Sequence, residues 1–192
     1  MLRRREQSRG IRMSELVETA DLDLDRDLFL RKLVRELAGT LEDVIGIEAA
    51  EGYISTVGSS VGRWIDQSYK EALGTSRLSA EEVGEVCVDL KRRIGGDFYL
   101  ISSSEEELVF GNRRCPFGEA VKDRPSLCMM TSNVFGRITA DNLGYARVEL
   151  QETIAQGHPG CRVVVRLKQV QGRAVSEREY YRAFDPELAD GP

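Results

Sequence analysis

Histidine is almost missing from this chain of 192 residues, in which His158 is the only one. A Ser-His-Asp triad would have to use that residue, although it lies in the turn Gly157-His158-Pro159-Gly160. No Gly-Lys-Ser/Thr follows the glycines of Gly58-Ser59-Ser60-Val61-Gly62, which excludes a phosphate-binding P-loop. The acidic run Glu105-Glu106-Glu107 is more typical of a solvated turn than of an acid/base pair. We therefore expect a protein that is not an enzyme.

Long apolar runs are also missing, and none approaches the ~20 residues that a membrane-spanning helix needs. The basic residues 1–5 are not followed by the apolar stretch of a signal peptide. We expect a cytoplasmic protein without membrane contact, whose thiols stay reduced. A net charge of −5 argues against direct nucleic-acid binding, because phosphate contacts need clustered lysine and arginine.

The length suits one domain with tails. Residues 1–26 carry a basic cluster followed by an acidic one and have little to bury, which predicts a disordered N-terminal tail. Residues 27–172 are expected to form a single α+β domain. Residues 173–192 are mixed and charged, and we expect a C-terminal tail or an extra edge element there.

Three helices are predicted in the first half of the domain. Residues 28–44 carry apolar side chains at three- and four-residue spacing, which makes one stripe. A second helix over residues 53–73 contains glycines four apart, which would let another helix approach closely. The sequence Ser79-Ala80-Glu81-Glu82 is a capping box that opens the third helix, and Gly95-Gly96 ends it.

Two strand pairs and another helix follow. Residues 98–101 and 108–110 read as the first pair, and residues 146–151 and 161–168 alternate apolar and polar side chains as the second. A helix is predicted from Pro125 towards residue 143. The order of helices, hairpin, helix and hairpin predicts an α+β fold, with helices covering an antiparallel sheet.

Three of the four cysteines carry the most informative pattern. Cys115 follows a predicted strand, and Cys128 lies in a first helical turn, where the helix dipole lowers a thiol pKa. Cys161 begins a strand, whose alternation turns it towards the same inner face as the valines. Soft thiolates suit zinc, copper(I) or iron–sulfur clusters, which indicates a metal or redox site. The other interpretation is that these thiols are small buried hydrophobes.

The remaining sulfur and imidazole groups also have two interpretations. His158 is either a fourth metal ligand or a turn residue exposed to water. Cys87 shares a helix face with Val83 and Leu90, so we expect it to fill the core.

The segments Asn112–Gly118, Pro125–Cys128 and Gly157–Val165 together resemble the methanogen output domain family. That family is attached to bacterial and archaeal signalling proteins. It is similar to the wider 4-vinyl-reductase-like superfamily of small-molecule-binding domains, haem–nitric-oxide sensors and transport-particle subunits. The resemblance covers about residues 27–170 and implies the α+β fold of that superfamily.

The cysteine pattern is also similar to the C-terminal domain of repressors that sense iron–sulfur clusters. In those proteins a Cys-Pro-aromatic run, a cysteine after a twelve-residue gap and a later strand cysteine hold the cluster. The resemblance therefore assigns an iron–sulfur cluster, or alternatively zinc, to Cys115, Cys128 and Cys161. It implies a stand-alone sensory or regulatory module that answers a small effector and acts on a signalling protein partner. The repressors carry a DNA-binding domain before this region, whereas about 25 residues precede it here, so we expect no direct repression.

Two alternatives stay open. One is a small-molecule-binding module with an apolar pocket between helices and sheet, with Trp64, Tyr69 and Phe135 as wall residues. The other is a thiol-redox switch in which Cys115 and Cys128 form a reversible disulfide. A homodimer through the first two helices is compatible with each of these functions, and the glycines of the second helix are a hint of it.

Overall fold

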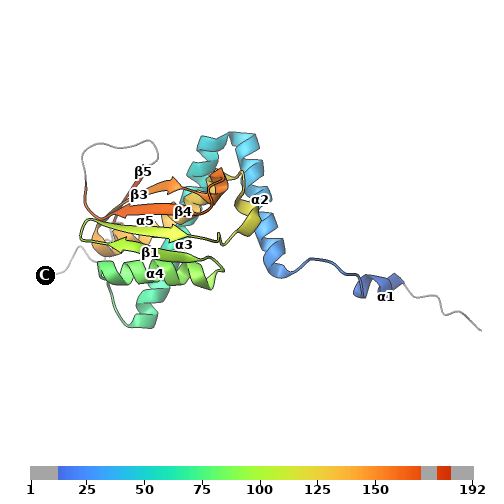
Figure 1. The fold of residues 1–192 in the computed structure, drawn as a ribbon, viewed down its shortest axis with the longest axis horizontal. Helices are drawn as coiled ribbons and strands as arrows, with labels where there is room; N and C mark the ends of the chain where they lie inside the picture. The colour runs from blue at the N-terminus through green and yellow to red at the C-terminus, as the bar shows by residue number, and fades with distance from the viewer. Residues whose placement is uncertain (1–12, 170–176, 183–192) are drawn as a thin grey trace, which may run out of the picture.

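A five-stranded antiparallel sheet forms the centre of the computed structural model, which describes residues 13–169 and 177–182 (Figure 1). The helices that precede it are α1 (Met13–Glu18), α2 (Arg26–Ile45), α3 (Ile47–Leu73) and α4 (Ala80–Arg93). The strands are β1 (Phe98–Ser103), β2 (Glu107–Asn112), β3 (Tyr145–Glu152), β4 (Cys161–Arg166) and β5 (Glu177–Tyr181). Between β2 and β3 lie the short turns η1 (Gly118–Val121) and η2 (Pro125–Leu127) and the helix α5 (Cys128–Leu143), and η3 (Ile154–Gln156) precedes β4.

The strands follow the order β1-β2-β4-β3-β5, and every neighbouring pair is antiparallel. Helix α5 packs against β3 and β5, α4 packs against β1, and α3 lies along α5. The predicted α+β fold, an antiparallel sheet with helices packed on it, is therefore confirmed.

Local signals set the ends of the helices. The Ser79 hydroxyl accepts the Glu82 N–H at 3.2 Å, and the Glu82 carboxylate accepts the Ser79 N–H at 2.7 Å, which completes the predicted capping box. Asp25 caps α2 by accepting the Leu28 N–H at 2.8 Å. Each predicted helix is present, although α3 begins earlier than expected.

Glycines bring α3 and α5 close together. A Cβ atom at Gly58 would lie 2.8 Å from the Cβ of Asn133, and one at Gly62 would lie 2.9 Å from the Cβ of Arg137. Any larger residue would force the helices apart. This is the close approach that the four-residue spacing predicts.

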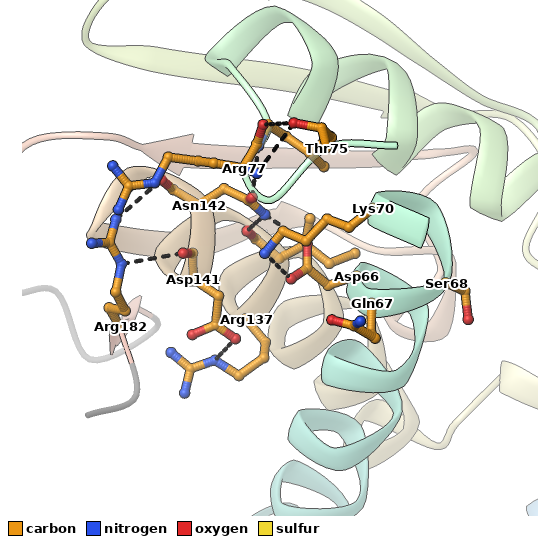
Figure 2. A network of polar contacts seen from close by, with 12 residues as sticks. Asp66, Gln67, Ser68, Lys70, Thr75, Arg77, Arg137, Asp141, Asn142 and Arg182 are labelled. Carbon is orange, nitrogen blue, oxygen red and sulfur yellow. Dashed lines mark hydrogen bonds and ion pairs between the residues drawn. The ribbon is translucent and has the colours of Figure 1, made fainter. Parts of the chain in front are cut away.

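A buried polar network joins the same two helices to the segment before α4 (Figure 2). The Asn142 amide donates to the Asp66 carboxylate at 2.6 Å and to the Ile138 carbonyl at 2.8 Å. Its oxygen accepts the Leu78 N–H at 2.8 Å, and Lys70 pairs with Asp66 at 2.6 Å. One amide thus connects three parts of the chain inside the protein.

The main core lies between the sheet and helices α4 and α5. Cys87 is buried in it, as predicted. Phe135 of α5 is fully buried, with ring centroids 5.7 Å from Phe98 and 4.9 Å from Phe110. The sheet contributes inward-facing residues of β2, β3 and β4, namely Leu108, Phe110, Ala146, Val148, Val163 and Val165.

The two ends of the chain differ from the domain body. Helix α1 lies apart from it, joined by an extended segment (Figure 1). In the segment expected as a C-terminal tail or edge element, β5 forms an edge strand on β3. The other parts of the two expected tails, residues 1–12, 173–176 and 183–192, lie outside the described residues. No helix among the described residues combines the length and hydropathy that a membrane span requires.

Candidate functional site

Cys115, Cys128 and Cys161 line one small cavity, here called the thiol cavity, near the end of β2 and the starts of α5 and β4. Its volume is about 20 Å³, which is room for a single water molecule. The structure thus brings together the three cysteines that the sequence singled out. Apart from these cysteines, the wall is formed by Phe98, Asn112, Pro116, Phe117, Val121, Leu127, Thr131, Leu150, Thr153, Ile154, Ala155 and Val163.

The loop after β2 positions Cys115. Its sulfur faces the backbone N–H groups of Phe117 and Gly118, which favour the thiolate. Pro116 packs against the end of α4, where a Cβ atom at Gly96 would lie 2.9 Å from the Pro116 Cγ. The contact between Pro116 and Gly96 therefore holds the Cys115 loop against the segment that follows α4.

A close backbone contact positions Cys161 at the start of β4. A Cβ atom at Gly160 would lie 2.7 Å from the Asn112 carbonyl oxygen, so a glycine lets β4 begin directly against β2. The Cys161 sulfur accepts hydrogen bonds from the Asn112 amide and the Ile154 N–H, each at 3.5 Å. Cys161 faces the core side of the sheet, as its alternation with the valines predicts.

Cys128 is the first residue of α5, as predicted. Burial raises the pKa of its thiol to about 12, and the nearby thiols of Cys161 and Cys115 add to the rise. The Thr153 hydroxyl and the Lys91 ammonium oppose it only in part. The expectation that the helix dipole lowers this pKa is wrong, because desolvation dominates at this position.

Burial raises the pKa of the Cys115 thiol as well. Both cysteines are therefore protonated at neutral pH, and all four cysteines are free thiols. Disulfide exchange proceeds through a thiolate, so protonated and buried thiols react slowly. This state disfavours a fast Cys115–Cys128 redox switch.

His158 lies on the surface, away from the wall of the thiol cavity. Its backbone N–H donates to the Thr153 carbonyl at 3.2 Å, which holds the turn before β4. In the part of the chain that the structure describes, no three histidine, cysteine, aspartate or glutamate side chains form a group that would hold a metal ion as they stand. Metal binding at the cysteines would require their side chains to rearrange.

Lys91 is the site residue that the sequence analysis missed. It is only 4% exposed, and its ammonium donates to the Thr131 hydroxyl at 2.8 Å. The ammonium also lies 5.2 Å from the Phe98 ring centroid and 5.4 Å from that of Phe135. The available signal was its position on the apolar face of α4, four residues after Cys87 and eight after Val83.

Burial lowers the pKa of Lys91 to about 8. Charge on the cysteines, first on Cys115 and then on Cys87, Cys128 and Cys161, acts against that decrease. Lys91 therefore remains mostly protonated at neutral pH, and its charge acts to lower the pKa of the Cys115 and Cys128 thiols.

An open cleft of about 460 Å³ adjoins the thiol cavity and shares Cys128, Leu150 and Thr153 with it. Arg178 of β5 lines this cleft, pairs with Glu51 of α3 at 2.7 Å and donates to the Met129 sulfur at 3.0 Å. The cleft offers a small molecule a route to the Cys128 side of the cavity.

The three wall residues expected for an apolar pocket do not lie together. Trp64 and Tyr69 line a shallow groove of about 340 Å³ between α3 and α4. Phe135 is a core residue with no exposed surface.

Comparison with solved structures gives the fold class. The phenol-responsive sensory domain of the transcription activator PoxR, solved with phenol, has a TM-score of 0.58 at 19% identity, with 76% of each chain covered. A trafficking protein particle complex subunit 3 from Naegleria fowleri, covalently bound to palmitic acid, has a TM-score of 0.49 at 16% identity, covering 73% of this chain and 96% of that one. The protein has the 4-vinyl-reductase-like fold, which it shares with the PoxR sensory domain.

Comparison of sequences gives the family. The family model described as methanogen output domain 1 matches residues 33–166, which include all three cysteines of the thiol cavity. The chain belongs to the methanogen output domain 1 family, as its motifs predicted. No curated protein matches the sequence.

Proposed function

We propose that this chain is a sensory or regulatory module in which Cys115, Cys128 and Cys161 hold an iron–sulfur cluster or, as the alternative metal, zinc. Membership of an output-domain family and a fold shared with a phenol-responsive sensory domain support the sensory role. In this proposal the module works in the cytoplasm and passes its signal to a protein partner rather than to DNA.

The observation that carries the metal proposal is the meeting of three cysteines at one cavity, with hydrogen-bond donors directed at the sulfurs of Cys115 and Cys161. Two backbone N–H groups face Cys115, and the Asn112 amide and the Ile154 N–H donate to Cys161. Cys128 lies beside the Thr153 hydroxyl, which itself donates to the Gln156 side chain at 3.0 Å. Cysteines that serve only as small hydrophobes do not need such donors. Donors directed at sulfur are the outer-shell contacts that orient and tune thiolate ligands.

The donor chemistry fits either group, because three thiolates suit both zinc and iron–sulfur clusters. The cavity of about 20 Å³ is the size of one water molecule, so a cluster requires the wall to open further than an ion does. Binding of either group would take the protons from the thiols. A cluster held by three cysteines supplies one iron that remains open to a small exogenous ligand or to oxygen, which is a chemical basis for sensing.

A second candidate function is favoured by the cleft of about 460 Å³ beside Cys128. In this alternative a small molecule binds between α3, β3 and β5 and contacts Arg178, and the cysteines form part of its wall without metal. The cleft carries the Glu51–Arg178 ion pair, so a ligand with an anionic group would compete with Glu51 for the guanidinium.

Metal analysis of anaerobically purified protein separates these functions. We expect a brown protein with iron and sulfide, and loss of both in Cys128→Ser. Two matched controls should keep the metal: Cys87→Ala removes the buried thiol that lies outside the cavity wall, and His158→Ala removes the exposed imidazole. Zinc without iron would select the alternative metal. A colourless, metal-free protein would overturn the metal proposal and leave the cleft as the site to test.

A further inference from the structure

Lys91 is a buried lysine with no ion pair among the residues that the structure describes. The side chain is almost completely buried, and its polar partner in the described part of the chain is the neutral Thr131 hydroxyl rather than a carboxylate. Burying an ammonium ion costs several kcal/mol when no opposite charge accompanies it. Cation–π contacts with Phe98 and Phe135 offset only part of this cost.

The Lys91 ammonium lies next to the cavity that the three cysteines line. Thr131 and Phe98, which hold the ammonium, are both part of the thiol-cavity wall. Lys91 is not one of the wall residues, and its ammonium reaches the cavity only through these two contacts. Charge on Cys115, and after it on Cys87, Cys128 and Cys161, would raise the pKa of Lys91, so the ammonium responds to the cavity cysteines and also to the core thiol of Cys87.

A zinc ion or iron–sulfur cluster bound by the three cysteines would supply the negative charge that the Lys91 ammonium lacks. Three thiolates carry more negative charge than a divalent ion can neutralise, so a zinc ion held by them forms a net anionic group. The same holds for an oxidised iron–sulfur cluster held by three thiolates. No carboxylate pairs with the ammonium in the part of the chain that the structure describes, whereas an anionic metal–thiolate group in the cavity would provide a counter-charge.

We propose that Lys91 is a positioning residue that neutralises an anionic metal–thiolate group held by Cys115, Cys128 and Cys161. This inference rests on the proposed metal site and adds a requirement to it: the site selects occupants whose total charge, ligands included, is negative. The Lys91 ammonium would not contact the metal, and its charge would act on the metal–thiolate group across the wall of the thiol cavity.

Two neutral variants test the charge, and one conservative variant restores it. Lys91→Met keeps the length of the side chain and suits the apolar surroundings, and Lys91→Gln keeps a polar head for Thr131. Lys91→Arg keeps the charge. We expect the metal-free Lys91→Met protein to unfold at the same temperature as the wild type or higher, because it no longer buries an unbalanced charge.

The metal-loaded proteins give the decisive readout. In competition with a chelator, Zn²⁺ should bind about tenfold or more weakly to both neutral variants, while Lys91→Arg stays closer to the wild type. If the wild type holds an iron–sulfur cluster, the neutral variants should lower its midpoint potential, because a nearby cation favours the reduced, more negative state. A tenfold effect on that equilibrium corresponds to about 59 mV for one electron.

The outcomes separate the two proposals. Equal Zn²⁺ affinity in wild type and in folded Lys91→Met and Lys91→Gln would show that the lysine is only structural, and would overturn this inference while the metal site remains. A wild type that binds neither zinc nor iron would refute the metal site, and the inference with it. Weaker binding in both neutral variants with recovery in Lys91→Arg would support both.

Discussion

At the scale of single residues, the side-chain amide of Asn142 makes three hydrogen bonds to buried groups. It satisfies the Leu78 N–H, the Asp66 carboxylate and the Ile138 carbonyl, all in the interior. Removing a buried partner leaves the others desolvated and unpaired, which costs more than the hydrogen bond itself contributes. The network therefore depends on this amide more strongly than on its exposed members.

We expect Asn142→Ala to lower the free energy of unfolding by about 2–4 kcal/mol, since it leaves the buried Leu78 N–H unpaired and the Asp66 carboxylate with Lys70 alone. Asn142→Asp should cost at least as much, because a second carboxylate would face Asp66, whose oxygen now lies 2.6 Å from the amide nitrogen. Urea unfolding monitored by circular dichroism measures both.

The matched control is Gln67→Ala, which removes an exposed side-chain hydrogen bond of 2.9 Å to Glu71 on the same helix. Its effect should stay within about 0.5 kcal/mol. Equal losses in Asn142→Ala and Gln67→Ala would contradict the role assigned to the buried network.

The site could be predicted from the sequence only where residue type and spacing carry the chemistry. Cys115, Cys128 and Cys161 were found because thiols are rare and their spacing is distinctive. Lys91 was missed, because a lysine on a helix is ordinarily solvated and only the fold buries it. The predicted direction of the shift in the Cys128 pKa was wrong for the same reason. The start of a helix can be recognised in a sequence, whereas the desolvation of a side chain depends on the fold.

At the scale of elements, the packing of α3 on α5 depends on where each glycine lies in α3. Gly58 faces α5, and a Cβ atom there would meet Asn133 at 2.8 Å. Gly52 lies on the same helix with nothing within 4 Å of its Cβ position. The two positions share the helix and differ in the space around them.

Gly58→Ala should therefore destabilise the protein by about 1–3 kcal/mol through overpacking. Gly52→Ala should stabilise it by up to about 1 kcal/mol, since alanine is the better helix former and meets no neighbour. Thermal unfolding of the two variants measures the difference in sign. Stabilisation by both substitutions would mean that α3 and α5 do not pack as closely as the structure has them.

Helices α2 to α5 and strands β1 to β4 could be predicted because their signals are local, whereas α1 falls in the segment that was expected to be a disordered tail. The capping box at Ser79, the apolar spacing in α2 and the strand alternation before and after the Gly157–Gly160 turn all lie within a few residues of the elements that they specify. Strand β5 could be expected only as one alternative, because it gains its hydrogen bonds from β3, far away in the chain. The strand order likewise depends on distant pairing and was not predicted.

At the scale of the whole molecule, the apolar stripe of α2 is only partly covered. Val34 packs against the smaller cluster around Ala38, whereas Leu30, Leu33 and Leu37 remain exposed. An exposed apolar stripe of this length marks an interaction surface. Exposed charges beside it change sign along the helix, from Arg26 and Lys32 near its start to Glu36 and Asp43 towards its end, with Asp27 paired to Arg31.

This distribution suits a second copy of the chain, because two α2 helices packed antiparallel would bring Lys32 of each copy near Asp43 of the other. We expect sedimentation equilibrium to give twice the monomer mass of 21.5 kDa. Leu33→Lys with Leu37→Lys should yield monomers, while Ile101→Lys, at an exposed apolar position on β1, should not. Lys32→Glu should weaken the dimer, and adding Asp43→Lys should restore it. A wild type that stays monomeric, or a charge exchange that restores nothing, would exclude this arrangement.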